Sequence, residues 1–236
     1  MPSIIENTES LWVVYKPSGW LVHPAKGTDA PNLVDWLIEQ GAPKTVAPVH
    51  RLDLPTSGVI LYSDSSEQRG KLGRFFVDGT VEKRYVALVH GHTRSKGIIK
   101  KPLDDERRGK PLEALTRYRT RENLGGFSFI SVRPATGRKH QIRRHLHSIR
   151  HPVVGDERYR TEKFVAVPAF PNRLWLHAER VSLPDGRSFV APLAPELQAH
   201  LEVLRASMVP KADAAKVDVA KVDVAKVGVA NEEGAS

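Results

Sequence analysis

The chain has 236 residues, with 36 Lys and Arg against 27 Asp and Glu, a formal net charge of +9 and no cysteine. This length and the lack of cysteine exclude a disulfide-stapled small domain and fit one domain, with or without an appendage, in a reducing compartment. Neither a signal peptide nor an apolar stretch of transmembrane length is present, so a soluble cytoplasmic protein is expected. The positive charge favours a polyanionic partner. The segment from Lys211 onward is slightly acidic, so the positive charge belongs to the residues before it.

The first expected element is a short strand at residues 11–15, which are rich in β-formers. It runs into the pattern K-P-x-G-x-x-x-H-P, which begins at Lys16. A hairpin with a proline stop explains every residue of this pattern except the choice of Lys16 and His23. Residues 32–40 then have the periodicity of a short helix, capped by an asparagine and stopped by a glycine.

The next motif, H-R-L-D-L-P-T-S-G, places a single carboxylate, Asp53, between a basic pair and a turn-forming run. The apolar residues 59–62 follow it and predict a buried strand. Asp53 is therefore expected on a loop at the mouth of a strand, where scaffolds often hold reactive groups. Taken alone, a turn aspartate that bonds its own backbone is the competing interpretation.

A helix and a strand are predicted after this motif. The helix begins at the capping box of Ser65 and ends at the next Asp-Gly pair. Residues 81–91 are strand-like and place Lys83 and Tyr85 on one face. Without further context, Tyr85 is a half-buried strand aromatic. The polar residues 94–123 are interpreted as exposed loops or a hairpin insertion.

The most basic segment follows a predicted strand at residues 127–132. Between residues 138 and 150 there are five Lys or Arg and no acid. A helix that starts at Thr136 and Gly137 directs one apolar stripe to the core, with a basic stripe beside it that contains Arg143, His147 and Arg150. Phosphate neutralisation requires such a surface. We reject a metal site at the four histidines of this region, because arginines surround them and no acid or cysteine lies among them.

The C-terminal part contains three further elements and a repeat. Residues 174–178 predict the end of a buried strand, residues 181–191 a hairpin and residues 195–208 an amphipathic helix. Beyond Pro210 the five-residue repeat gathers no single face in a helix or a strand. We therefore expect one folded domain at residues 1–209 and a disordered tail at 210–236.

Together, these motifs resemble those of the RluA-type pseudouridine synthases. The matches span roughly residues 11–178 and are K-P-x-G-x-x-x-H-P, H-R-L-D-x-x-T-S-G, K-x-Y, T-G-R-x-H-Q-I-R with H-P-x-x-G-D, and L-x-L-H-A. The resemblance implies an α+β fold, with a mixed, mostly antiparallel sheet, flanking helices and a central active-site cleft. It also implies isomerisation of uridine in RNA to pseudouridine, a reaction that requires neither a metal nor another cofactor.

The same resemblance assigns site residues. It makes Asp53 the catalytic carboxylate, as nucleophile or as base, and pairs it with Arg143, whose charge keeps it ionised. Tyr85 would stack on the target base and is a candidate acceptor of the C5 proton. Because the uridine must leave its stack, Arg51 is expected to fill the gap. The other implied substrate-binding residues are His50, Thr56, Lys83, Arg138, His140, Gln141 and Leu176.

Among short members, the finer resemblance is to an enzyme that modifies uridine 65 of tRNA, at the end of the T stem, so tRNA is the expected partner of a monomeric enzyme. The same chemistry on ribosomal RNA is one alternative. A non-catalytic RNA-binding module is another, and it would not need a carboxylate at Asp53. A glycoside hydrolase would need a second carboxylate about 5 to 10 Å from the first, for which Glu82 is the nearest candidate.

Overall fold

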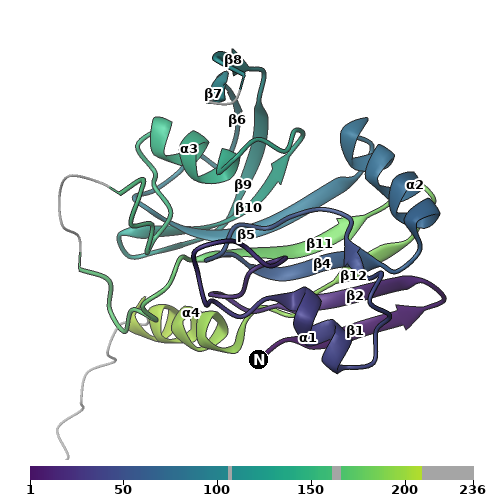
Figure 1. Cartoon of the computed structure of the whole chain (residues 1–236). Helices are drawn as coiled ribbons and strands as arrows, with labels where there is room; N and C mark the ends of the chain where they lie inside the picture. Colours follow the sequence, from purple (N-terminus) through teal and green to yellow (C-terminus); the bar gives the residue numbers. More distant parts are fainter. Residues whose placement is uncertain (106–107, 161–165, 209–236) are drawn as a thin grey trace, which may run out of the picture.

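The computed structural model describes residues 1–105, 108–160 and 166–208, and one large sheet forms its centre (Figure 1). Within these residues ten strands join in the order β1-β2-β4-β11-β5-β10-β9-β6, with β12 beside β11 and β3 beside β4. Only β4 and β11 pair in parallel, so the prediction of a mixed, mostly antiparallel sheet in an α+β fold is confirmed. The strands are β1 (Ser3–Thr8), β2 (Leu11–Lys16), β3 (Ala47–Pro48), β4 (Ser57–Ser63), β5 (Glu82–His90), β6 (Lys96–Lys100), β9 (Leu115–Leu124), β10 (Phe127–Pro134), β11 (Leu176–Ser182) and β12 (Ser188–Val190), and a separate hairpin contains β7 (Leu103–Asp105) and β8 (Lys110–Leu112).

The helices cover the sheet where their sequence signals predicted them, with one exception described below. Asn32 caps α1, because its side chain accepts a bond from the N–H of Asp35 at 3.0 Å. Ser65 caps α2 in the same way, with the N–H of Gln68 at 3.3 Å. In Figure 1, α3 lies above and α4 below the part of the sheet that contains β5, β9 and β10. The four helices of the described residues are α1 (Leu33–Glu39), α2 (Ser66–Val77), α3 (Gln141–Ser148) and α4 (Pro195–Met208).

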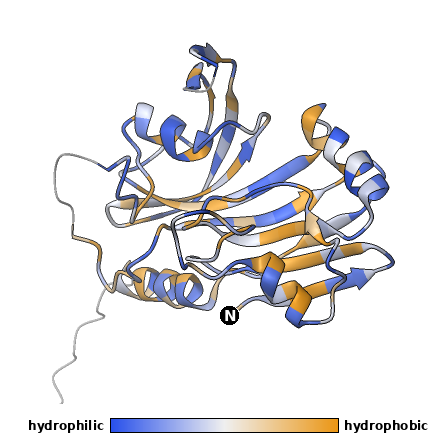
Figure 2. Cartoon of the chain, in the orientation of Figure 1, coloured by the Kyte–Doolittle hydropathy of each residue, from blue (hydrophilic) through white to orange (hydrophobic). Residues whose placement is uncertain are grey.

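Strand β4 carries the loop of Asp53 into the core. All its residues are buried, and it belongs to the central orange strands in Figure 2, because side chains on both of its faces pack against apolar neighbours. Its second residue, Gly58, has a φ of 124°, and a Cβ added there would lie 2.2 Å from the carbonyl oxygen of Ala178. Glycine at this position therefore lets β4 and β11 approach directly behind the loop.

Helix α3 begins later than the sequence predicts. We expect it to start at Thr136 and Gly137, but its first residue is Gln141. The side-chain oxygen of Gln141 accepts bonds from the hydroxyl of Thr136 at 2.6 Å and from the N–H of Arg138 at 3.0 Å, and these bonds hold the preceding residues in a turn. His140 follows with a left-handed φ of 53°. This turn, and not a helical face, presents Arg138 and His140.

The interpretation of residues 94–123 as exposed loops or a hairpin insertion is correct only for β7 and β8. Strands β6 and β9 extend the main sheet at its edge. Charged side chains occupy outward positions of β9, while Thr116 and Tyr118 are buried, so few apolar residues mark the strand. Strand β1 was not anticipated either, because all six of its residues are exposed and show no apolar alternation.

No helix within the described residues has both the length and the apolar character needed to cross a bilayer. The predicted disordered tail, 210–236, lies outside those residues.

Candidate active site

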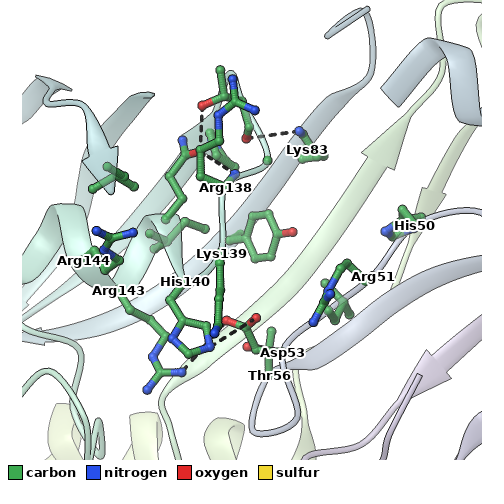
Figure 3. A pocket seen from close by; sticks show the side chains of 18 of the residues that line it. His50, Arg51, Asp53, Thr56, Lys83, Arg138, Lys139, His140, Arg143 and Arg144 are labelled. Carbon is green, nitrogen blue, oxygen red and sulfur yellow. Dashed lines mark hydrogen bonds and ion pairs between the residues drawn. The ribbon is translucent and has the colours of Figure 1, made fainter. Parts of the chain in front are cut away.

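A cavity of about 1020 Å³ opens over β5, between the loop before β4, the turn before α3 and the side of α2. Every residue that the sequence motifs assigned to the site lines it, although these residues come from segments more than a hundred positions apart. Figure 3 shows the labelled side chains around this space. The cavity therefore joins the separate motifs into one site.

Asp53 points into the cavity with its side chain 21% exposed. Its Oδ2 lies 4.0 Å from Nη1 of Arg143, and its Oδ1 lies 3.9 Å from Nε2 of His140 (Figure 3). The turn that carries it is closed by its main chain, because its carbonyl oxygen accepts the N–H of Thr56 at 3.0 Å. The carboxylate is thus free of the turn and faces two nitrogen-bearing side chains.

Arg143 is held by a second carboxylate, Asp156, which the sequence motifs contain but which we did not assign. Nε and Nη2 of Arg143 each donate to one oxygen of Asp156 at 2.7 Å, in a two-pronged bond. Burial opposes the ionisation of Asp156, but the bond from Arg143 and those from the N–H groups of Tyr159 and Arg158 outweigh it and lower its pKa. Asp156 therefore fixes the guanidinium and leaves Nη1 directed at Asp53.

The expected basic stripe on α3 is consequently interrupted. Arg143 is only 6% exposed, whereas His147 and Arg150 are exposed. The pattern of residues along the helix did not reveal this difference, because the partner of Arg143 comes from a later loop.

His140 is oriented by Tyr159, another residue that sequence reasoning missed. The hydroxyl of Tyr159 lies 3.1 Å from Nδ1 of His140, and the guanidinium carbon of Arg143 lies 5.2 Å from the centre of the tyrosine ring. Burial lowers the pKa of His140, although the charge of Asp53 acts in the opposite direction. His140, Tyr159 and Arg143 thus contact one another and form one group beside Asp53.

Strands β5 and β11 form the floor of the cavity. Tyr85, Lys83 and Leu176 line it from these strands. Burial, and then the charge of Asp53, raises the pKa of Tyr85, so its phenol keeps its proton. Burial also lowers the pKa of Lys83, whose ammonium donates to the carbonyl of Thr136 at 3.4 Å. An aromatic ring and an apolar side chain provide a surface on which a flat base can lie.

Three of the expected substrate-binding residues form hydrogen bonds with other parts of the protein. The amide of Gln141 donates to Leu115 and Thr116 as well as accepting the two bonds described above, so its bonding capacity is used. His50 stacks on Phe76 with ring centres 4.5 Å apart and accepts the N–H of Leu61 through Nε2 at 3.1 Å. Burial lowers the pKa of His50 to about 3, which keeps it neutral.

The third of these residues, Thr56, is 2% exposed and has a buried hydroxyl without a hydrogen-bond partner. Its carbonyl accepts a bond from Lys16. Gln141 and His50 therefore shape the site with groups that protein atoms already bond, whereas the hydroxyl of Thr56 is left without a partner among the described residues.

The rim of the cavity is positive. Arg51 is exposed beside Asp53, and Arg138 donates to the carbonyl of Glu113 at 3.1 Å. Sequence reasoning did not assign three further cations of the rim, although all lie in or just after the basic motif: Lys139, Arg144 and Arg158. A positive rim of this kind suits a substrate that carries phosphates.

Lys16 supports the loop of Asp53 from below. It begins the first sequence motif, but the sequence alone did not predict a role for it. Its side chain is fully buried, and its ammonium donates to the carbonyls of Pro17, Leu54 and Thr56 at 3.0, 2.9 and 2.8 Å. Two of these carbonyls belong to the turn that follows Asp53. A lysine is needed here because three converging buried carbonyls require a donor of three bonds.

Lys16 should make the stability of the protein rise with pH. Burial and the charge of Arg173 lower its pKa from 10.5 to about 7, so between these values the unfolded chain binds one more proton than the folded chain. We expect the free energy of unfolding in urea to increase more between about pH 7 and pH 9 for the wild type than for Lys16→Met. Lys44→Met, which removes an exposed lysine, should behave like the wild type, and the same pH dependence in all three proteins would contradict this account.

Glu82 does not supply the second carboxylate that a glycoside hydrolase requires. It alternates with Lys83 along β5, does not line the cavity, and lies 3.5 Å from both Arg84 and Arg133. Asp104 and Asp105 also line the cavity, but they belong to the β7–β8 hairpin beyond the edge of the sheet.

Comparison with known proteins places this cavity in context. The family model described as RNA pseudouridylate synthase matches residues 10–148, which include Asp53, Tyr85 and Arg143. Among solved structures, human RNA pseudouridylate synthase domain containing 4 shares the fold, with a TM-score of 0.72 and 24% identity over 86% of this chain and 92% of that chain.

Two curated relatives share the same percentage of identical residues with the chain, over different lengths. tRNA pseudouridine synthase C of Salmonella typhimurium is 34% identical over 208 residues, which cover 78% of this chain and 80% of the relative. Ribosomal large subunit pseudouridine synthase D of Xylella fastidiosa is 34% identical over 230 residues, which cover 86% of this chain and 69% of the relative. The two relatives differ in the RNA that their names specify.

Proposed function

Because the chain belongs to the RNA pseudouridylate synthase family and is therefore an isomerase that acts on RNA, we propose that it converts a specific uridine of tRNA to pseudouridine with Asp53 as its catalytic carboxylate. The observation that carries this proposal is the position of Asp53, which points into the cavity within 4.0 Å of both Arg143 and His140. A cation at this distance stabilises the negative charge of a carboxylate. The binding-only alternative gives no reason for this arrangement.

The reaction requires the N1–C1′ bond of uridine to break, the uracil to turn, and C5 to bond to C1′, with loss of the C5 proton and protonation of N1. Asp53 acts at the ribose or at the base, as nucleophile or as base. Tyr85 and Leu176 hold the detached uracil against the floor. Since the phenol of Tyr85 keeps its proton, Tyr85 serves as a stacking surface and is a poor acceptor of the C5 proton.

The target uridine must leave its helix to reach Asp53, because the bond that breaks is enclosed by stacked bases. Arg51 is exposed next to Asp53 and is long enough to enter the space that the flipped base leaves. The cations of the rim then neutralise neighbouring phosphates. Neither a metal nor an organic cofactor takes part in this proposal.

The finer choice of tRNA, at uridine 65 of the T stem, rests on the motifs that resemble the tRNA-modifying members and on the Salmonella relative. Ribosomal RNA is the second candidate substrate, because the Xylella relative is equally identical. We further propose residues 1–209, which contain the motifs and precede the five-residue repeat, as the catalytic domain of a monomeric enzyme. We propose the cytoplasm as its location because the chain contains no cysteine.

Tritium release from transcripts labelled at uridine C5 tests the substrate. The wild-type protein should release tritium from unmodified tRNA and not from ribosomal RNA, and mapping of the product should locate pseudouridine at the T-stem uridine. Release from ribosomal RNA alone would keep the chemistry and overturn the substrate. Absence of release from both RNAs, with RNA binding intact, would favour the non-catalytic module.

A further inference from the structure

Arginines cross the sheet on the face opposite the cavity. Side chains alternate along β5, so Tyr85 lines the cavity while Arg84 points to the other face. The strand register pairs Arg84 with Arg180 of β11 and Arg133 of β10 with Arg117 of β9. These four residues, Arg84, Arg117, Arg133 and Arg180, are called the arginine row. It crosses four adjacent strands and so extends roughly 14 Å.

Glu82 gives the row only partial compensation. Its Oε1 lies 3.5 Å from both Arg84 and Arg133, and its side chain is 50% exposed, so one screened carboxylate serves two guanidinium groups. The Nε atoms of Arg84 and Arg180 are buried and have no hydrogen-bond partner. The row thus contains donors that the protein itself does not satisfy.

The positive surface continues to the edge of the sheet. Lys96 of edge strand β6 pairs in register with Arg119 of β9, and both side chains are exposed. Across the described residues, no ion pair joins Arg117, Arg119 or Arg180 to a carboxylate. Three like-charged pairs therefore stand directly opposite each other, which disfavours the sheet in the free protein. A bound polyanion would remove this repulsion.

We propose that the arginine row is a second RNA-binding surface, which binds phosphates of a part of the substrate RNA remote from the uridine in the cavity. The inference rests on the proposed function for the presence of RNA. Guanidinium groups bind phosphate through paired donors, and a row of them follows a chain of phosphates. A protein partner would need buried apolar anchors, whereas the large exposed apolar side chains that adjoin the surface are Ile98 and Val190.

The position of β6 makes simultaneous binding at both faces possible. β6 is the last strand of the sheet, as Figure 1 shows, and β9, with Arg117 and Arg119, is its neighbour. An RNA that enters the cavity from the β7–β8 side can therefore continue around this edge to the opposite face. The surface would extend the contact beyond the target helix, toward a distant part of a folded RNA.

Neutralisation of the exposed arginines of the row and of the adjacent Arg119 tests the proposal, and this triple variant is called the row variant. The variant combines Arg117→Gln, Arg119→Gln and Arg133→Gln, and the matched control, which loses the same charge at exposed sites outside the cavity, combines Lys26→Gln, Lys44→Gln and Lys71→Gln. The dissociation constant for a full-length unmodified tRNA transcript, and for a ribosomal RNA fragment, is measured as a function of salt. We expect the row variant to bind roughly one to two orders of magnitude more weakly at 0.15 M salt, with a log–log salt slope smaller by about 2 to 3.

The outcomes separate the row from the catalytic assignment. The row variant should fold at least as stably as the wild type, since like-charge repulsion is removed, and should raise KM for tRNA without changing kcat. Equal losses in row variant and control would overturn the proposal, as would unchanged RNA affinity in both. Loss of binding to polyglutamate with RNA affinity unchanged would assign the surface to an acidic protein. Because these affinities need no turnover, they decide on the row even if the wild type releases no tritium.

Discussion

Asp53→Asn is expected to abolish tritium release from the RNA substrate, with a loss of at least about 10³-fold in kcat. The substitution keeps the size of the side chain but replaces the charged carboxylate with a neutral amide, which is far weaker as a nucleophile or a base. Asp53 is held by its loop and not by strong side-chain bonds, since its neighbours His140 and Arg143 lie 3.9 and 4.0 Å away. The folded structure should therefore survive the change, and the affinity for RNA should stay within about threefold of the wild-type value.

Glu82→Gln is the matched control for this experiment. It removes a carboxylate of β5 that does not line the cavity, and it should turn over like the wild type at saturating RNA. Full activity of Asp53→Asn would show that a group other than Asp53 is the catalytic one. Loss of activity together with loss of fold would make Asp53 a structural residue.

Asp156→Asn should have the next largest effect, because it leaves Arg143 buried without its counter-ion. Arg143 is 7% exposed and Asp156 fully buried in their side chains, and breaking such a pair costs about 3–5 kcal/mol of stability. Release of the guanidinium also removes the constraint that directs Nη1 at Asp53. A misplacement of this kind should lower kcat by about 10²-fold, with a smaller change in KM. Urea unfolding and steady-state tritium release measure the two effects.

A paired replacement separates stability from catalysis at this site. In the double variant Arg143→Met with Asp156→Leu, apolar side chains occupy the space of the ion pair, so stability should recover by a few kcal/mol relative to Asp156→Asn. Activity should remain low, because no cation then faces Asp53. Recovery of activity in the double variant would show that the pair only maintains the fold. Asp156→Glu, which keeps the charge, should retain more activity than either variant.

Helix caps and buried strands could be read from the sequence because their signals are local. Asn32 and Ser65 bond to N–H groups three residues away, and the apolar run that follows Asp53 marks β4 regardless of its neighbours. The start of α3 could not be read in this way. Gln141 turns its side chain back onto Thr136 and holds the preceding residues in a turn, so the helix starts only at Gln141. The same residue could equally have continued a helical pattern.

For the site, the motifs indicated the residues that gather around the cavity, but their roles depended on partners distant in sequence. Gln141 and His50 carry suitable groups for substrate binding, yet protein atoms already occupy those groups. Asp156 and Lys16 were present in the motifs and had no assigned role. Their partners lie 13 and about 40 positions away, so no spacing along the chain connects them.

The sequence by itself determined the family, the α+β character and the set of side chains that carry the chemistry. Motif order and apolar periodicity can be recognised along the chain without any tertiary contacts. Only the tertiary structure decided that Asp156 clamps Arg143, that Lys16 supports the turn after Asp53, and that arginines of four strands line up behind the cavity. These arrangements depend on strand register and on the crossing of elements. A shift of one residue would send each of these strand side chains to the other face of the sheet.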